Sequence, residues 1–158
     1  MTNVSKTLIV GLGNPLMGDD GVGNYIIAEL TQKNLPDHIK LIDCGTDILK
    51  ILSHLEDVKK IIFIDALDAY NKPGTIYQFQ KEEILAFPGQ SRTAHFISVI
   101  ESIRLLDQIN QDFHQAEIQL IGIQPEKVEL HNTLSPSVKQ AAWRIIQKLE
   151  EELMHPGY

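Results

Sequence analysis

The sequence lacks most of what secreted and membrane proteins need. Its 158 residues include a single cysteine, Cys44, so no disulfide can form within the chain, which is typical of a reducing compartment. No apolar run approaches the ~18 residues that cross a bilayer. The first six residues lack the apolar core of a signal peptide. We therefore expect a cytoplasmic protein with no membrane partner.

Several nucleotide and nucleophile signatures are also missing. The net charge of −7 leaves no basic patch for phosphates, so we expect no nucleic-acid partner. The Gly-Lys-Ser/Thr that ends a phosphate-binding loop does not follow the glycines of this sequence. A dinucleotide-binding fingerprint would need a third glycine after Gly11 and Gly13, but position 16 is Leu16. There is no G-x-S-x-G nucleophile elbow. Cys44 has no partner base nearby in the sequence and is expected to be buried.

The residues that are present predict one α/β domain covering residues 1–158. Apolar runs predict strands at 7–10, 39–42, 60–65, 75–79 and 117–123, the fourth being an edge or antiparallel strand. Helices are expected at 22–32, at 95–107, and from Pro136 with Ser135 as N-cap. Thr46 or Asp47 can cap a further helix that carries Ile48, Leu49, Leu52 and Leu55. This order implies a three-layer α/β/α sandwich on a mostly parallel, twisted sheet of about five strands.

The last helix has the clearest pattern of the chain. Its apolar residues recur at helical spacing and predict one buried stripe: Val138, Ala141, Ala142, Ile145, Ile146, Leu149 and Leu153. By contrast, residues 81–93 are the least regular part of the sequence, and no element is predicted there.

The stretch from Gly11 to Gly23 joins the first strand to the first helix. Its glycines permit tight turns and close approach of the backbone. It ends on two adjacent carboxylates, Asp19 and Asp20, either of which could cap the helix that follows, and Asp19 is the better candidate for that cap.

Polar residues follow every predicted parallel strand. In an open α/β sheet, binding and active sites form outside the carboxyl ends of the strands. They are Asn14, Asp19 and Asp20, then Asp43, Gly45 and Thr46, then Asp65 and Asp68, then Gln124 and Glu126, with His95 opening a helix that could face the same edge. An aspartate at a strand end is often only a cap or turn former. That role suits Asp43 and Asp47 better than Asp65, which ends a strongly apolar strand. An imidazole with two carboxylates would suit nickel, zinc or cadmium and leave positions open for water or substrate.

The N-terminal motif of this sequence resembles those of two protein families. Residues Leu8 to Pro15 look like the start of a peptidyl-tRNA hydrolase, but that similarity stops at Pro15 and the first histidine here is His38. The fuller resemblance is to the hydrogenase maturation endopeptidases. It is carried by the G-x-G-N-x-L-x-x-D-D/E-x-x-G opening at Gly11–Gly23, D-x-G-T at Asp43–Thr46, Asp65-Ala66, Pro73-Gly74-Thr75, His95, Ile121–Glu126 and Leu134-Ser135-Pro136. Cys44 departs from the glycine of many members.

That resemblance implies an endopeptidase that removes the C-terminal extension of a [NiFe] hydrogenase large-subunit precursor after nickel insertion. It implies that Asp20, Asp65 and His95 bind the metal, that Asp20 and Asp65 are catalytic, and that Gly45 and Thr46 contact the substrate. The nickel would come with the precursor, and zinc or cadmium could occupy the same site. Either a carboxylate or the metal could drive the hydrolysis, as in aspartic or metal-assisted peptidases. The alternatives are a non-catalytic module that binds nickel or the precursor, and a peptidyl-tRNA hydrolase.

Overall fold

Five strands form one sheet at the centre of the molecule. The computed structural model describes residues 4–87 and 94–155, and for residues 94–97 it describes the backbone alone. The strands are β1 (Lys6–Leu12), β2 (Ile39–Gly45), β3 (Val58–Ala66), β4 (Ile76–Gln80) and β5 (Glu117–Ile123). Their order is β2-β1-β3-β5-β4. All neighbouring pairs are parallel except β4 with β5, so the predicted antiparallel edge strand is confirmed.

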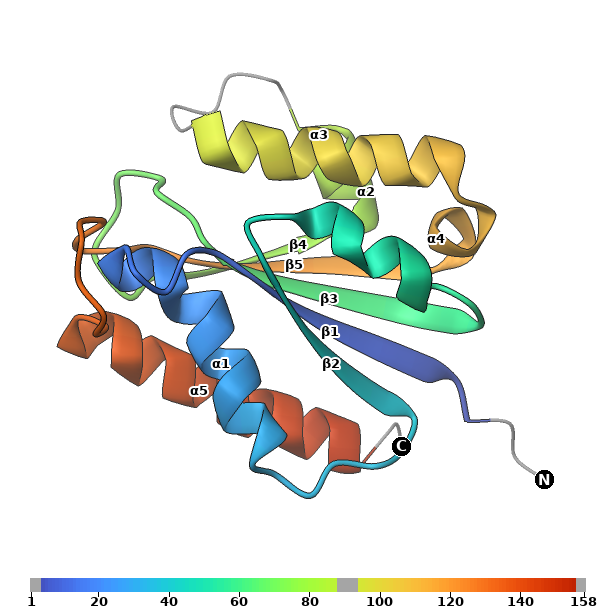
Figure 1. Ribbon diagram of the computed structural model, residues 1–158, viewed down its shortest axis with the longest axis horizontal. Coiled ribbons are helices and arrows are strands. Elements are labelled where there is room, and N and C mark those ends of the chain that lie inside the picture. Colours follow the sequence, from blue (N-terminus) through green and yellow to red (C-terminus); the bar gives the residue numbers. More distant parts are fainter. Residues whose placement is uncertain (1–3, 88–93, 156–158) are drawn as a thin grey trace.

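Helices cover both faces of this sheet (Figure 1). One face carries α1 (Val22–Thr31) and α5 (Pro136–Met154), and the other carries α2 (Lys81–Leu85), α3 (Ala94–Ile109), α4 (Gln111–Gln115) and the 3₁₀ helix η2 (Ile48–His54). The apolar residues accordingly form two core clusters, one on each face. This confirms the predicted three-layer α/β/α sandwich. It also explains why residues 61–66 of β3 are all buried, because a strand covered on both faces has no solvent side.

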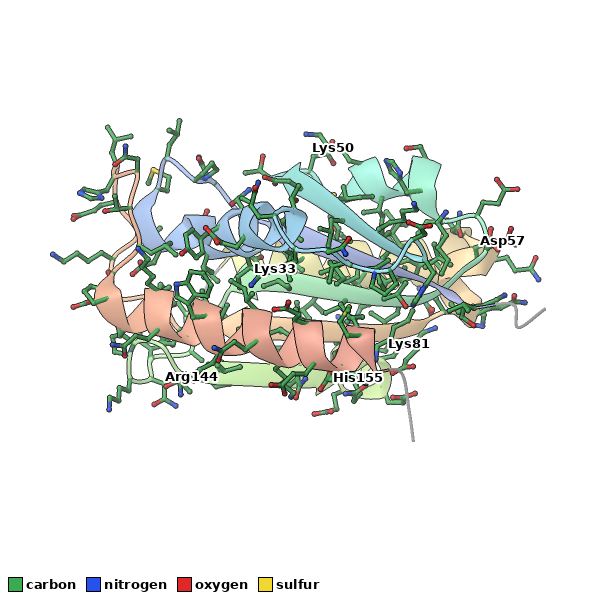
Figure 2. All side chains as sticks on the ribbon, turned by 90° about the horizontal axis from the view of Figure 1, so that it is seen from below. Lys33, Lys50, Asp57, Lys81, Arg144 and His155 are labelled. Carbon is green, nitrogen blue, oxygen red and sulfur yellow. The ribbon has the colours of Figure 1, made fainter. Side chains whose placement is uncertain are left out.

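Helix α5 matches its sequence pattern residue for residue. Ser135 is the N-cap and Pro136 is the first helical residue, as predicted, and the seven residues of the predicted stripe are all buried. Figure 2 looks onto this helix, with Arg144 partway along it and Lys33 on the side of α1. There the Lys33 ammonium lies 3.3 Å from the Glu150 carboxylate.

The predicted second helix is a 3₁₀ helix, and the four apolar residues predicted for it divide between buried and exposed positions. In η2, Ile48 and Ile51 are buried, whereas Leu49 and Leu52 are each 41% exposed. Side chains three residues apart share one side of a 3₁₀ helix, so the buried face follows that spacing instead of the α-helical one. Asp47 caps the helix by accepting a hydrogen bond from the Leu49 amide at 3.1 Å, which confirms its structural role. The short helices α2 and α4 were not predicted.

Gly23 allows α1 to lie directly on the ends of the central strands. A Cβ atom built at Gly23 would be 2.4 Å from the carbonyl oxygens of both Leu12 in β1 and Ile64 in β3. No real side chain tolerates such contacts, so glycine is required here. The start of α1 is therefore held against the carboxyl ends of β1 and β3.

Within the described ranges, 4–87 and 94–155, no helix has both the length and the apolar content needed to span a membrane.

Candidate active site

The carboxyl ends of the parallel strands bring the predicted polar residues to one edge of the sheet. In register, Gly11 of β1 lies between Asp43 of β2 and Ile64 of β3, and Asp65 lies opposite Gly122 of β5. The loops that follow β1, β3 and β5, and the beginning of α3, gather at the left end of the molecule in Figure 1, and the loop that follows β2 lies nearer the middle.

Asp20 lies on the short 3₁₀ helix η1 (Gly18–Gly21), between β1 and α1. One of its carboxylate oxygens, Oδ2, accepts a hydrogen bond from the Asn14 amide at 2.9 Å. The other oxygen, Oδ1, accepts no hydrogen bond from any residue that the structure describes, and the side chain is half-buried. Asp20 therefore has one oxygen fixed by the turn and one available to a ligand.

Asp19 does not cap α1, which corrects the prediction for that residue. The N-cap of α1 is Gly21, and no side chain caps the helix. The fully buried Asp19 carboxylate accepts four hydrogen bonds from distant residues instead. Its Oδ2 accepts from the Glu126 and Lys127 amides at 2.9 Å each and from the Ser135 hydroxyl at 2.8 Å, while Oδ1 accepts from the Ser135 amide at 2.7 Å. Asp19 thus ties η1 to the loop between β5 and α5.

Asp65 is the penultimate residue of β3 and is 2% exposed. Its Oδ1 accepts a hydrogen bond from the following amide, that of Ala66, at 2.8 Å. The Gly23 contact with Ile64 places the start of α1 directly beside this residue. The segments that carry Asp20 and Asp65 therefore meet at one edge.

His95 is the second residue of α3, and its side chain lies outside the described part of the structure. One turn further on, Val99 lines a cavity of about 150 Å³ together with Leu12 of β1 and with Gly45 and Thr46. The first half of α3 therefore lies over the end of β1. Among the side chains that the structure describes, no three His, Cys, Asp or Glu residues form a metal-binding group, so the predicted triad with His95 stays a prediction.

Gly45 and Thr46 border this cavity, where they could contact a substrate. Gly45 has a φ of +57°, and its carbonyl accepts a hydrogen bond from the Gly13 amide at 2.8 Å. Asp43 supports the turn by accepting from the Gly45 amide at 2.9 Å and from the Asn24 side-chain amide at 2.7 Å. This confirms Asp43 as a turn former, and it adds Asn24 of α1 as a support that the sequence reasoning missed.

Gln124 is a structural support, although the sequence placed it among the possible site residues. Its side-chain oxygen accepts hydrogen bonds from the Ala69 and Asn71 amides at 2.8 and 3.2 Å. Its side-chain nitrogen donates to Asp68 Oδ1 at 3.0 Å. The 4%-exposed Gln124 therefore fixes the loop after β3, and Asp68 is engaged in the same contact.

Cys44 is fully buried, as predicted. Burial raises the pKa of its thiol from 9.0 to about 11, because the charged thiolate loses its hydration there. A buried thiol with a raised pKa is a poor nucleophile, which agrees with the structural role expected for Cys44.

Comparison with known proteins gives a consistent set of similarities. Residues 24–152 match the hydrogenase maturation protease family, a range that begins after Asp20. The hydrogenase 2 maturation protease of Escherichia coli is 29% identical over 154 residues, covering 96% of this chain and 93% of that protein. The [NiFe] hydrogenase maturation protease HybD of Thermococcus kodakarensis superposes with a TM-score of 0.80 at 32% identity, covering 94% of this chain and 99% of the other. The E. coli maturating endopeptidase HybD gives 0.75 at 27% identity, with 93% of each chain covered.

Proposed function

The chain belongs to the hydrogenase maturation protease family, and on this basis we propose that it removes the C-terminal extension of a [NiFe] hydrogenase large-subunit precursor after nickel insertion. The reaction is hydrolysis of one peptide bond in a partner protein. The opening that the sequence shares with peptidyl-tRNA hydrolases accounts for the first strand and turn alone.

One observation supports this proposal most directly. Gly23 lets the first turn of α1 lie on the carbonyl ends of β1 and β3, so two segments that each carry an aspartate are held together. Asp20 lies three residues before Gly23, and Asp65 directly follows Ile64. Two carboxylates at the carboxyl edge of a parallel sheet are a reasonable centre for hydrolysis.

Asp20, Asp65 and His95 are the residues that would bind the nickel ion of the precursor. The donor set fits, because carboxylate oxygens and an imidazole nitrogen are ligands that nickel, zinc and cadmium accept. Asp20 Oδ1 meets this requirement, since no described residue donates a hydrogen bond to it. When bound, the ion would supply a positive charge that polarises a nearby carbonyl group.

The remaining chemistry belongs to the residues of the chain. The Asn14 amide holds one Asp20 oxygen in place, so the other oxygen would either bind the ion or, with the ion held by Asp65 and His95, take a proton from an attacking water. Gly45 and Thr46, at the border of the neighbouring cavity, would contact the extended tail of the precursor. Asp65, which is almost fully buried, would help to hold the metal ion and the peptide bond in position beside Asp20.

The source of the metal would make cleavage a checkpoint. If nickel arrives with the precursor, then an unloaded precursor lacks the group that binds Asp20, Asp65 and His95. The enzyme can distinguish two forms of the precursor only if it binds them with different affinity. Here the nickel-loaded form alone would offer the metal that binds these three residues. The enzyme would therefore process loaded precursor in preference to unloaded precursor.

A cleavage assay tests this proposal. The purified chain is incubated with nickel-loaded and nickel-free precursor, and the mass of the large subunit is followed by mass spectrometry. We expect the loaded precursor alone to lose its C-terminal extension. Binding of the loaded precursor without loss of mass would favour the non-catalytic binding module and contradict the proposed peptidase.

A further inference from the structure

Two loops beside the candidate active site carry large apolar side chains that no core residue covers. We call them the rim loops, residues 14–19 between β1 and α1 and residues 126–131 after β5. Leu16 is 61% exposed, Val128 is 52% exposed and Leu130 is 82% exposed. Single exposed apolar residues are ordinary, but three on two hydrogen-bonded loops concentrate apolar surface in one part of the molecule, and apolar patches often mark contact sites.

The backbones of the rim loops hold each other side by side. The Gly18 amide donates to the His131 carbonyl at 2.7 Å, and the His131 amide donates to the Leu16 carbonyl at 2.9 Å. The Asp19 amide donates to the Lys127 carbonyl at 3.0 Å. Gly18 permits this close approach, since a Cβ atom there would lie 2.8 Å from the Lys127 carbonyl oxygen.

The buried Asp19 carboxylate reinforces the pairing, because it accepts hydrogen bonds from the Glu126 and Lys127 amides at 2.9 Å each. The apolar side chains are thus carried by a backbone that is already fixed. A surface ordered before binding loses less conformational entropy when a partner docks.

The rim loops continue directly into the candidate active site. The Asn14 amide contacts Asp20, and the Leu16 amide donates to the Asn14 side-chain oxygen at 3.0 Å. A folded protein that presents a peptide bond to Asp20 is brought next to the surface around it. The apolar patch occupies that position.

The charges around the patch indicate the chemistry of its partner. Glu126 and Glu129 are exposed, while Lys127 is the one lysine or arginine of the rim loops, which also carry the exposed His131. The rim is therefore acidic overall around an apolar centre. Its complement is a protein surface with apolar side chains surrounded by lysine or arginine.

We propose that the rim loops dock the folded body of the precursor, with Leu16, Val128 and Leu130 in contact with an apolar area bordered by basic residues. This inference rests on the proposed function for the identity of the partner. It assigns binding of the precursor body to a surface distinct from the residues that would bind its nickel and its tail.

The test compares two matched double variants. Leu16→Ser with Leu130→Ser changes the patch, and Leu105→Ser with Ile109→Ser changes two exposed apolar residues of α3, 46% and 59% exposed. We expect the first pair to weaken binding of nickel-loaded precursor at least about tenfold and to raise KM with little change in kcat, because the lost contacts are the same in ground and transition states. The α3 pair should bind and process like the wild type. Thermal unfolding verifies that both variants are folded.

Equal binding and processing by both double variants would overturn the docking proposal while leaving the peptidase intact. If the wild type binds the precursor but removes no tail, the proposed function fails, and the binding comparison still decides the role of the rim loops. As a second measurement, Glu126→Gln with Glu129→Gln should reduce the salt dependence of binding. An unchanged salt dependence would contradict the basic character of the partner surface.

Discussion

Asp20→Asn is expected to abolish removal of the precursor tail, with a loss in kcat/KM of at least about 100-fold. Asparagine has the same shape and can still accept the hydrogen bond that the Asn14 amide gives to Asp20 at 2.9 Å. It cannot take a proton from water, and its neutral amide is a poor metal ligand. The measurement is the rate at which the trimmed large subunit appears by mass spectrometry.

Asp47→Asn is the matched control for this change. Asp47 is an exposed aspartate near the same edge, where it caps η2, and asparagine is an equally good N-cap. We expect its processing rate to stay within about twofold of the wild type. A normal rate in Asp20→Asn would exclude Asp20 from the reaction.

Asp19→Ala is expected to destabilise the protein by roughly 2–4 kcal/mol, because it removes the acceptor of four part-buried hydrogen bonds. The Glu126, Lys127 and Ser135 amides would then lack their partner. The loop that leads into α5 and the loop that carries Asp20 would then be held together by their backbone hydrogen bonds without the carboxylate. The free energy of unfolding from urea denaturation measures this loss.

The neighbouring residue provides the control, since Asp20→Asn should change the free energy of unfolding by less than about 1 kcal/mol. Its carboxylate is half-buried and accepts one hydrogen bond, which asparagine preserves. Two adjacent aspartates thus have opposite roles, one in stability and one in activity. Equal stability of the two variants would contradict the role assigned to Asp19.

The fold was predictable because its main signals are local. The continuous apolar run that ends at Asp65 marks a strand buried on both faces, and the stripe from Val138 to Leu153 marks the inner face of α5. The mostly parallel order of strands then follows from the alternation of strands and helices. Spacing alone failed in η2, because the same apolar residues fit a 3₁₀ or an α-helical repeat until the sheet selects which of them are buried.

The roles of the site residues were less predictable because they depend on contacts between distant parts of the chain. Asp19 and Asp20 are chemically identical neighbours, and the partners of Asp19 lie 107 to 116 residues further on. Gln124 likewise bonds to backbone amides more than 50 residues away. Local sequence contains no signal for such pairings. The carboxyl edge itself was predictable, since it requires only that the strands be parallel.

The central claim is that Asp20, Asp65 and His95 together form one metal site. The most direct test is to titrate the protein with cadmium and measure the heat of binding by calorimetry. The wild type, Asp20→Asn, Asp65→Asn, His95→Ala and the control Asp47→Asn are compared after circular dichroism verifies their folding. We predict one ion per wild-type chain and a loss of affinity of at least about tenfold in each of the three site variants, since even the hydrogen-bonding partners of metal ligands have effects of that size. The Asp47→Asn control should bind like the wild type. Unchanged affinity in any one of the three site variants would contradict the claim.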